Sequence, residues 1–144
     1  MRFSLGSLLV ACAITAVLAL SFLPLAKSTH GAMAVEQGAE ELARELQATR
    51  QLAVANNSTY KVLFDRGAGA YYILSEDAFA LSRHIQLPPG VEWEKLSTNP
   101  IVFYGTGRCA AGGTYSLVFQ GLKYRVQVVV ATHSGRVRVE RGNP

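Results

Sequence analysis

An uncharged and strongly apolar run over residues 3–26 constrains this chain more than any other feature of its sequence. At about 1.5 Å of rise per residue, a helix over this run would be roughly 36 Å long. That length is sufficient to cross a hydrocarbon core of about 30 Å with some tilt. We therefore expect residues 3–26 to form a transmembrane helix that anchors whatever follows.

The remainder of the chain has room for one compact domain and a connecting helix. The chain has 144 residues, of which 49% are hydrophobic and 17% charged, a balance that excludes an intrinsically disordered protein. Cys12 lies inside the apolar run and Cys109 far beyond it, so the sequence supports neither an intramolecular disulfide nor a zinc site. We interpret Cys109 as a small apolar residue, with a free thiol or an intermolecular bond as alternatives.

The N-terminal run allows three interpretations, namely a cleaved secretory signal, a lipoprotein signal and a retained anchor. The apolar stretch is longer than the core of a typical signal and resumes after every candidate cleavage site. Residues 9–12 resemble the short motif that ends in the lipid-modified cysteine of lipoproteins. The sequence stays apolar through Leu20, however, where a lipoprotein would have a polar tether. A retained anchor fits best, and Arg2 supplies a short positive flank. We expect a single-pass protein of the inner (cytoplasmic) membrane, with a cytoplasmic N-terminus and an extracytoplasmic soluble domain.

A helical pattern continues after the apolar run. Small and apolar residues recur at spacings of three and four, which places them on one stripe of a helix that we expect to pack on a sheet. The stripe consists of Val35, Ala39, Leu42, Leu46, Thr49 and Ala53. Asn56 and Asn57 follow it, and asparagine tolerates the left-handed conformation that ends helices.

Beyond residue 59 the pattern favours β-strands. Residues 76–83 are polar, and we expect a loop or a short helix there. Ser134 and Gly135 predict a tight connection to a last strand whose two valines share one face. The expected strands cover residues 60–65 and 71–75 as a hairpin, then 91–93, 101–104, 114–119, 124–132 and 137–139.

The segment that begins at Phe3 resembles the prepilin N-terminus of type IV pilins and type II secretion pseudopilins. In this family a peptidase cuts before a phenylalanine and methylates it. The resemblance implies a leader of residues 1–2, cleavage between Arg2 and Phe3, and N-methylation of Phe3. Ser7 stands where the family has a glutamate that pairs with a neighbouring subunit, and Pro24 stands where many pilins have a helix-kinking proline.

Several later segments are similar to the H-type minor pseudopilins and the T-type fimbrial minor pilins. They are residues 50–57, 87–91, 103–107, 113–117 and 134–137. The resemblance implies a pilin-like α+β fold, in which a long, membrane-anchored N-terminal helix packs on a C-terminal antiparallel β-sheet. The chain would then divide into the leader, a transmembrane part at 3–26, an amphipathic continuation at 27–57 and a β-rich domain at 58–144.

The function implied by this resemblance is that of a non-enzymatic component of a type II secretion or type IV pilus filament. Its partners would be other pilin or pseudopilin subunits, the prepilin peptidase and an inner-membrane assembly platform. The residues themselves suggest no catalysis, cofactor or metal, because His84 and His133 are isolated from carboxylates and cysteines. The glycine-rich residues 105–110 lack the following helix that a phosphate-binding loop needs.

The last third of the chain is basic. Residues 100–144 contain six Lys or Arg and one acidic residue, which gives a net charge of +5. Arg125, Arg136 and Arg138 are candidates for contacts with DNA phosphates, and a solvated sheet face is the alternative interpretation. A second hypothesis for function is therefore a membrane-anchored extracytoplasmic β domain that binds DNA or another ligand outside any filament.

Overall fold

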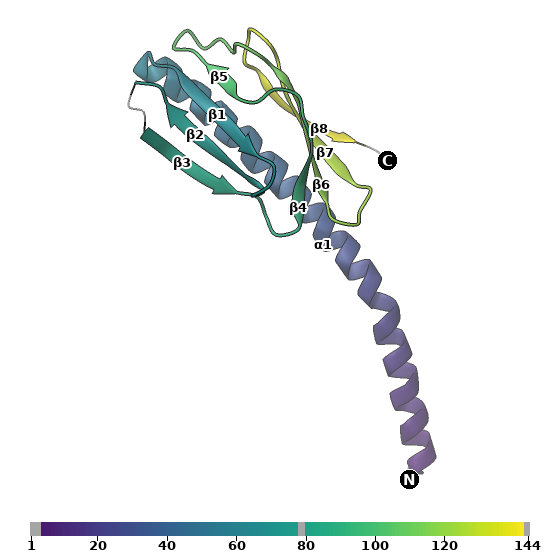
Figure 1. Cartoon of the computed structure of the whole chain (residues 1–144). Coiled ribbons are helices and arrows are strands. Elements are labelled where there is room, and N and C mark those ends of the chain that lie inside the picture. Colours follow the sequence, from purple (N-terminus) through teal and green to yellow (C-terminus); the bar gives the residue numbers. More distant parts are fainter. Residues whose placement is uncertain (1–3, 78–79, 143–144) are drawn as a thin grey trace. The chain divides into compact units, whose positions relative to one another are not determined.

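The computed structural model describes residues 4–77 and 80–142, and within them the side chains of residues 22–28 and 80–82 lie outside the description. One helix, α1 (Leu5–Asn56), precedes all the strands (Figure 1). The chain divides into two compact units, residues 1–30 and residues 31–144. The first unit contains the N-terminal part of α1, and the second contains its C-terminal part and both sheets.

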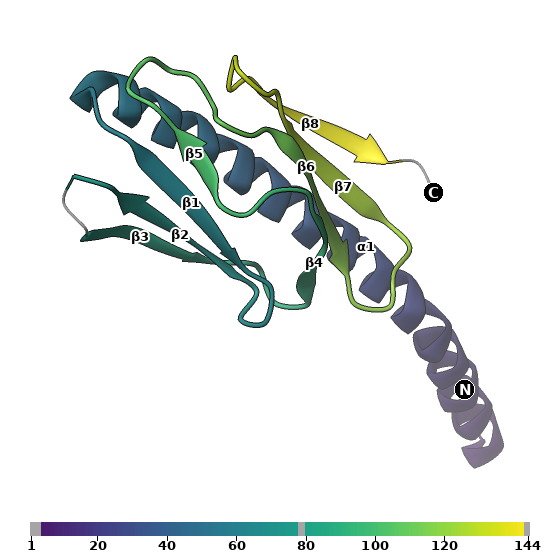
Figure 2. The same cartoon turned by 45° about the horizontal axis from the view of Figure 1, so that its top comes forward.

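The strands form two antiparallel sheets of four strands each. The first sheet has the order β3-β2-β1-β5, and its strands are β1 (Tyr60–Asp65), β2 (Ala70–Ser75), β3 (Ala80–Gln86) and β5 (Ile101–Phe103). The second has the order β4-β6-β7-β8, and its strands are β4 (Val91–Leu96), β6 (Gly113–Phe119), β7 (Arg125–Val130) and β8 (Val137–Gly142). Within the second unit, α1 runs behind both sheets, as both views show (Figure 2).

The predicted stripe of α1 is the part of the helix that enters the core. All six of its residues are at most 1% exposed, and the five apolar ones join one core cluster with side chains from both sheets. Strand β1 alternates buried and half-buried residues, as a strand packed on one face requires. The helix ends at Asn56, and Asn57 adopts a φ of 48°, which confirms the expectation from the asparagine pair.

An aromatic cluster fills the space between the two sheets. The Phe64 ring lies 5.1 Å from that of Trp93 in an edge-on arrangement and 4.8 Å from that of Tyr115 in a stacked one. Tyr71 lies 6.2 Å from Phe64, measured between ring centroids. Because Phe64 and Tyr71 come from the first sheet and Trp93 and Tyr115 from the second, these contacts join the sheets into one domain.

The structure corrects the sequence-based expectation in two places. Residues 80–86 form strand β3, where a loop or short helix was expected over 76–83, and the strands make two sheets where one was expected. Strand β3 lies at a sheet edge and, among the described strands, pairs with β2 alone, with a register shift between Ile73 and Leu74. An edge strand needs little apolar alternation, and the exposed Arg83 and His84 hide the pattern.

The N-terminal part of α1 continues as helix through Pro24. In the part of the chain whose residues are described, no helix has the length and apolar content needed to span a membrane.

Candidate assembly surfaces

The positions that the prepilin resemblance singles out lie at the start of α1. Arg2 and Phe3 lie outside the described residues, and the side chain of Pro24 is outside the description as well. Ser7 is exposed in the first turn of the helix, and its backbone N–H lies 3.3 Å from the hydroxyl of Ser4. Ser4 therefore caps the helix. The Ser7 hydroxyl is uncharged, so it offers a neighbouring subunit no carboxylate.

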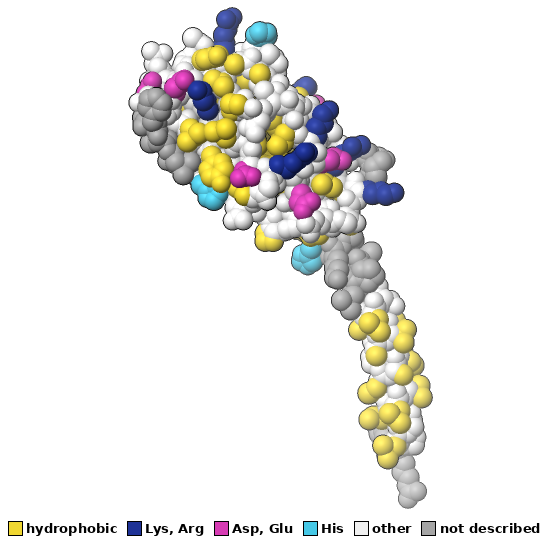
Figure 3. Space-filling view, viewed as in Figure 1, with side chains coloured by type: hydrophobic (Ala, Val, Ile, Leu, Met, Phe, Trp, Pro, Cys, Tyr) yellow, Lys and Arg dark blue, Asp and Glu magenta, His cyan; other side chains and the backbone are white. Residues whose placement is uncertain are grey.

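The first unit presents apolar side chains that nothing within it covers. Its large hydrophobic residues are 53–82% exposed, and Figure 3 shows hydrophobic side chains along this part of the helix. They are Leu5, Leu8, Leu9, Val10, Ile14, Val17, Leu18 and Leu20. The hydroxyls of Thr15 and Ser21 donate to carbonyl oxygens of the preceding turn, at 2.9 Å to Cys12 and 2.9 Å to Val17. These two hydroxyls are thus satisfied within the helix, which leaves the surface around them apolar.

Two polar clamps hold α1 against the sheets in the second unit. Glu45 of α1 pairs with Arg83 of β3 at 2.7 Å. On the other side, Glu36 accepts a hydrogen bond from the Tyr124 hydroxyl at 2.6 Å and one from Arg141 Nε at 3.3 Å. The Tyr124 hydrogen bond, aided by the charge of Arg141, lowers the pKa of the Glu36 carboxyl, and the same bond raises the pKa of Tyr124.

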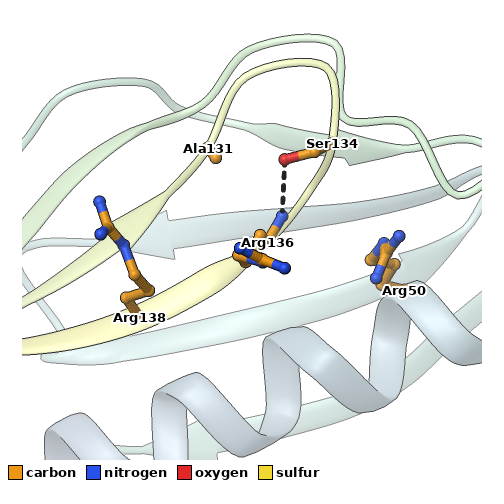
Figure 4. A pocket seen from close by; sticks show the side chains of 5 residues that line it. All are labelled: Arg50, Ala131, Ser134, Arg136 and Arg138. Atoms are coloured by element: carbon orange, nitrogen blue, oxygen red, sulfur yellow. Dashed lines mark hydrogen bonds between the residues drawn. The ribbon is translucent and has the colours of Figure 1, made fainter.

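A hollow of about 560 Å³ lies between the last turns of α1 and the β7–β8 connection. We call it the arginine pocket, and the residues that line it are Arg50, Ala131, Ser134, Arg136 and Arg138 (Figure 4). Arg50 comes from α1, while Arg136 directly precedes β8 and Arg138 lies within it. The backbone N–H of Arg136 donates to the Ser134 hydroxyl at 3.4 Å, which closes the turn beside the pocket.

Two glycines allow Arg50 to reach its place in this pocket. Its Nε donates to the carbonyl oxygen of Gly107 at 2.9 Å. A Cβ at Gly135 would lie 3.1 Å from both Cδ and Nε of Arg50, so the arginine stem rests directly on the turn backbone. Gly135 also has a φ of 64°, a conformation that glycine adopts without strain. The Nη groups of Arg50 are left for other partners, because its bond to Gly107 uses Nε.

Three arginine side chains line the pocket, and none of its described lining residues carries a carboxylate. Arg138 lies 3.6 Å from Glu140. Neither Arg50 nor Arg136 has an ion pair with any described carboxylate. Arginine is always charged, so the pocket is a concentrated positive site.

The three arginines that the sequence suggested for DNA do not gather at one place. Arg136 and Arg138 line the pocket, but Arg125 is paired in register with Gly142 at the opposite end of the β7–β8 ladder. Arg125 lies 3.7 Å from Glu94. Arg50 was not predicted from the sequence, because nothing in the helical pattern distinguishes it from a solvated arginine.

The remaining candidate residues show no constellation for chemistry. His84 is exposed and stacks on Tyr72, and His133 is exposed in the β7–β8 connection. Within the described residues, no group of His, Cys, Asp and Glu is arranged to hold a metal ion. Cys109 is 2% exposed and its thiol lies 3.2 Å from the Ala111 carbonyl oxygen, while burial raises the pKa of the thiol. It packs as a small core residue.

Comparison with known proteins identifies similar chains. The family model for type II transport protein GspH matches residues 38–135. The minor pseudopilin EpsH from the type 2 secretion system of Vibrio cholerae has a TM-score of 0.62 and 13% identity, over 74% of this chain and 96% of that one. The type IV minor pilin FimU of Pseudomonas aeruginosa has a TM-score of 0.61 and 19% identity, over 74% and 87%. None of the curated proteins compared with the chain matches it.

Proposed function

The chain belongs to the GspH family of type II transport proteins, a structural component of a pseudopilus or pilus, and we propose that it is a minor subunit anchored in the membrane until assembly. In this proposal, the apolar part of α1 holds the free subunit in the bilayer. Assembly then moves that helix from lipid to the helices of neighbouring subunits, where close packing replaces lipid contacts. The proposal covers a subunit of either a type II secretion system or a type IV pilus.

The observation that carries the proposal is the contrast between the two parts of α1. From Val35 to Ala53 one stripe of the helix is buried in the core of the second unit. Between Leu5 and Leu20 the large apolar side chains are more than half exposed and their polar neighbours bond to their own helix. An apolar surface of this kind requires lipid or other apolar helices around it.

Photocrosslinking in cells tests this proposal. A photoreactive phenylalanine at Leu9 should give adducts with other pilin or pseudopilin subunits when the assembly ATPase is present. In cells without that ATPase, the same position should react with lipid and give few subunit adducts. Identical adducts in both strains, or none in either, would contradict helix packing in a filament.

Processing and orientation form a second part of the proposal. The prepilin peptidase would cut between Arg2 and Phe3 and methylate Phe3, with the N-terminus in the cytoplasm and the β-rich domain outside it. Mass spectrometry of the mature chain, from cells with and without the peptidase, tests the cut. A chain that keeps Met1 in both strains would defeat this part, and the anchoring proposal would still stand.

The uncharged Ser7 supports a place at or near the filament tip. A subunit in the body of a filament has a neighbour whose terminal amine needs a carboxylate partner, and a charge left unpaired among apolar helices is costly. Ser7 is exposed and cannot supply that charge. Ser7→Glu is therefore expected to increase the amount of this chain per filament, measured by quantitative immunoblotting of sheared filaments.

A further inference from the structure

We propose that the arginine pocket binds the carboxylates of an acidic protein segment. That the segment belongs to a neighbouring filament subunit rests on the proposed function, whereas carboxylate binding itself does not. Three arginine side chains line a hollow of about 560 Å³, large enough for one or two side chains. The planar guanidinium group matches the two oxygens of a carboxylate in a pair of parallel hydrogen bonds.

The pocket is prepared for an anion before any ligand arrives. Arg50 is fixed by its Nε bond to Gly107 and by its stem on Gly135, so binding costs little additional side-chain order. Among the described residues, no carboxylate of the chain competes for Arg50 or Arg136. Two arginines elsewhere on the sheets are paired with carboxylates of α1, Arg141 with Glu36 and Arg83 with Glu45.

The surroundings of the pocket favour a polypeptide. A second hollow of about 170 Å³ shares Arg50 and Arg136 with the pocket and adds the exposed amide side chains of Gln47 and Gln51. A third, of about 270 Å³, extends from Arg50 and Gln51 to Val54 and Ala55. In these adjoining hollows, the arginines can contact acidic side chains and the glutamine amides can contact peptide groups. The small apolar residues can contact apolar side chains.

The charge distribution disfavours nucleic acid at this place. A duplex presents a row of phosphates and is bound by a stripe of unpaired basic side chains. Here the positive site is confined to one end of the β7–β8 ladder. Arg125 lies at the other end within 3.7 Å of Glu94, and Glu140 lies beside Arg138. These carboxylates would repel an extended polyanion, but they do not line the pocket.

Fluorescence anisotropy with the full-length chain in detergent micelles tests the proposal. The probe is a labelled hexapeptide of alternating glutamate and glycine with both ends blocked, and its control has glutamine in place of glutamate. The unaltered chain should bind the glutamate peptide at least about tenfold more tightly than the glutamine peptide, because only the former offers charge-assisted hydrogen bonds. The double variant Arg136→Gln, Arg138→Gln should weaken glutamate-peptide binding about tenfold or more.

Matched controls distinguish the pocket from general basicity and from misfolding. Arg125→Gln removes the same charge at the far end of the ladder and should change peptide affinity less than about twofold. The double variant Arg136→Lys, Arg138→Lys keeps both positive charges but loses the planar guanidinium groups that pair with two carboxylate oxygens. Compared with the glutamine double variant, it should recover only part of the peptide affinity. Equal thermal unfolding midpoints for all variants show that they are folded.

Three results would overturn the proposal. They are equal binding of the two peptides, equal loss of affinity in Arg125→Gln and in the pocket variant, and tighter binding of a 12-base-pair duplex than of the glutamate peptide. Peptide binding in micelles needs no filament. If the crosslinks from Leu9 failed, peptide binding by the pocket could still be observed. If peptide binding failed, the proposal of filament assembly would still stand.

Discussion

Arg50 joins α1 to two loops through one side chain. Its stem rests on Gly135 in the β7–β8 connection, and its Nε binds the carbonyl of Gly107 in the loop after β5. Neither contact is local in sequence, and each depends on a glycine with a positive φ. A residue that resembles an ordinary surface arginine in the sequence is therefore a structural connection and a wall of the arginine pocket.

Replacement of Gly135 should measure how firmly that connection is packed. We expect Gly135→Ala to lower the free energy of unfolding by about 2 kcal/mol, from left-handed strain and from a Cβ only 3.1 Å from Arg50. Gly121 is the matched control, because its φ is 80° and a Cβ there meets nothing within 4 Å. Gly121→Ala should cost only about 1 kcal/mol. Equal costs in urea unfolding would show that the Arg50 contact is not rigid.

Two buried tyrosines differ in the partners of their hydroxyl groups. The Tyr115 hydroxyl donates to the Thr98 carbonyl at 3.0 Å, whereas that of Tyr71 has no hydrogen-bond partner within the described residues. Burial raises the pKa of both, that of Tyr115 to about 12. Tyr115→Phe should lower the free energy of unfolding by about 1 kcal/mol, while Tyr71→Phe should leave it unchanged or raise it. Chemical denaturation compares them, and a larger loss for Tyr71→Phe would contradict the burial argument.

At the scale of elements, the sequence predicts best the elements whose apolar residues are buried along one face. The buried stripe of α1 and the inner strands β1, β2, β6 and β7 have apolar periodicity that follows from their burial, and they match expectation within a residue or two. The edge strands are where prediction is poorest. Strand β3 was missed, and β4 and β8 are longer than expected, because their exposed charged residues conceal the alternation.

The buried stripe of α1 gives a direct test of helix packing. Leu42 is 0% exposed in the core cluster, and Leu52 on the outer side of the same helix is 45% exposed. Leu42→Ala should therefore lower the free energy of unfolding by about 2–5 kcal/mol, since it removes contacts and leaves a cavity. Leu52→Ala should change it by about 0.5 kcal/mol or less. Similar effects of the two changes would mean that the stripe is not the packed side.

The clamp between α1 and the end of the second sheet should make stability depend on acid. The pKa of Glu36 is lowered in the folded chain, chiefly by the Tyr124 hydroxyl, so its stabilising effect is present above the ordinary value of 4.5. That effect is lost as the pH falls through the lower, folded pKa. We expect Glu36→Gln to show a smaller fall in stability than the unaltered chain between pH 6 and pH 3.

Urea unfolding at the two pH values provides the measurement. Tyr124→Phe is the matched variant, because it removes the main cause of the pKa shift and keeps the carboxyl. It should also flatten the dependence on acid. An unchanged acid dependence in both variants would show that Glu36 and Tyr124 do not interact in solution.

At the scale of the whole molecule, the sequence predicts the class of fold but not the arginine pocket. The order of one long helix and then strands follows from periodicity, because each element carries its own signal. The pocket combines Arg50 with Arg136 and Arg138 from the other end of the chain. Such a pocket depends on how α1 lies across the second sheet, which no local pattern contains. For the same reason Arg125, equally basic in sequence, lies elsewhere.

The central claim is that the mature subunit keeps its apolar helix and passes with it from the bilayer into a filament. Cell fractionation followed by mass spectrometry of the mature chain measures this directly. We predict that a chain containing residues 3–26 is in the membrane fraction without the assembly ATPase, and partly in sheared filaments when the ATPase is present. A freely soluble chain that lacks residues 3–26, in either strain, would contradict the account.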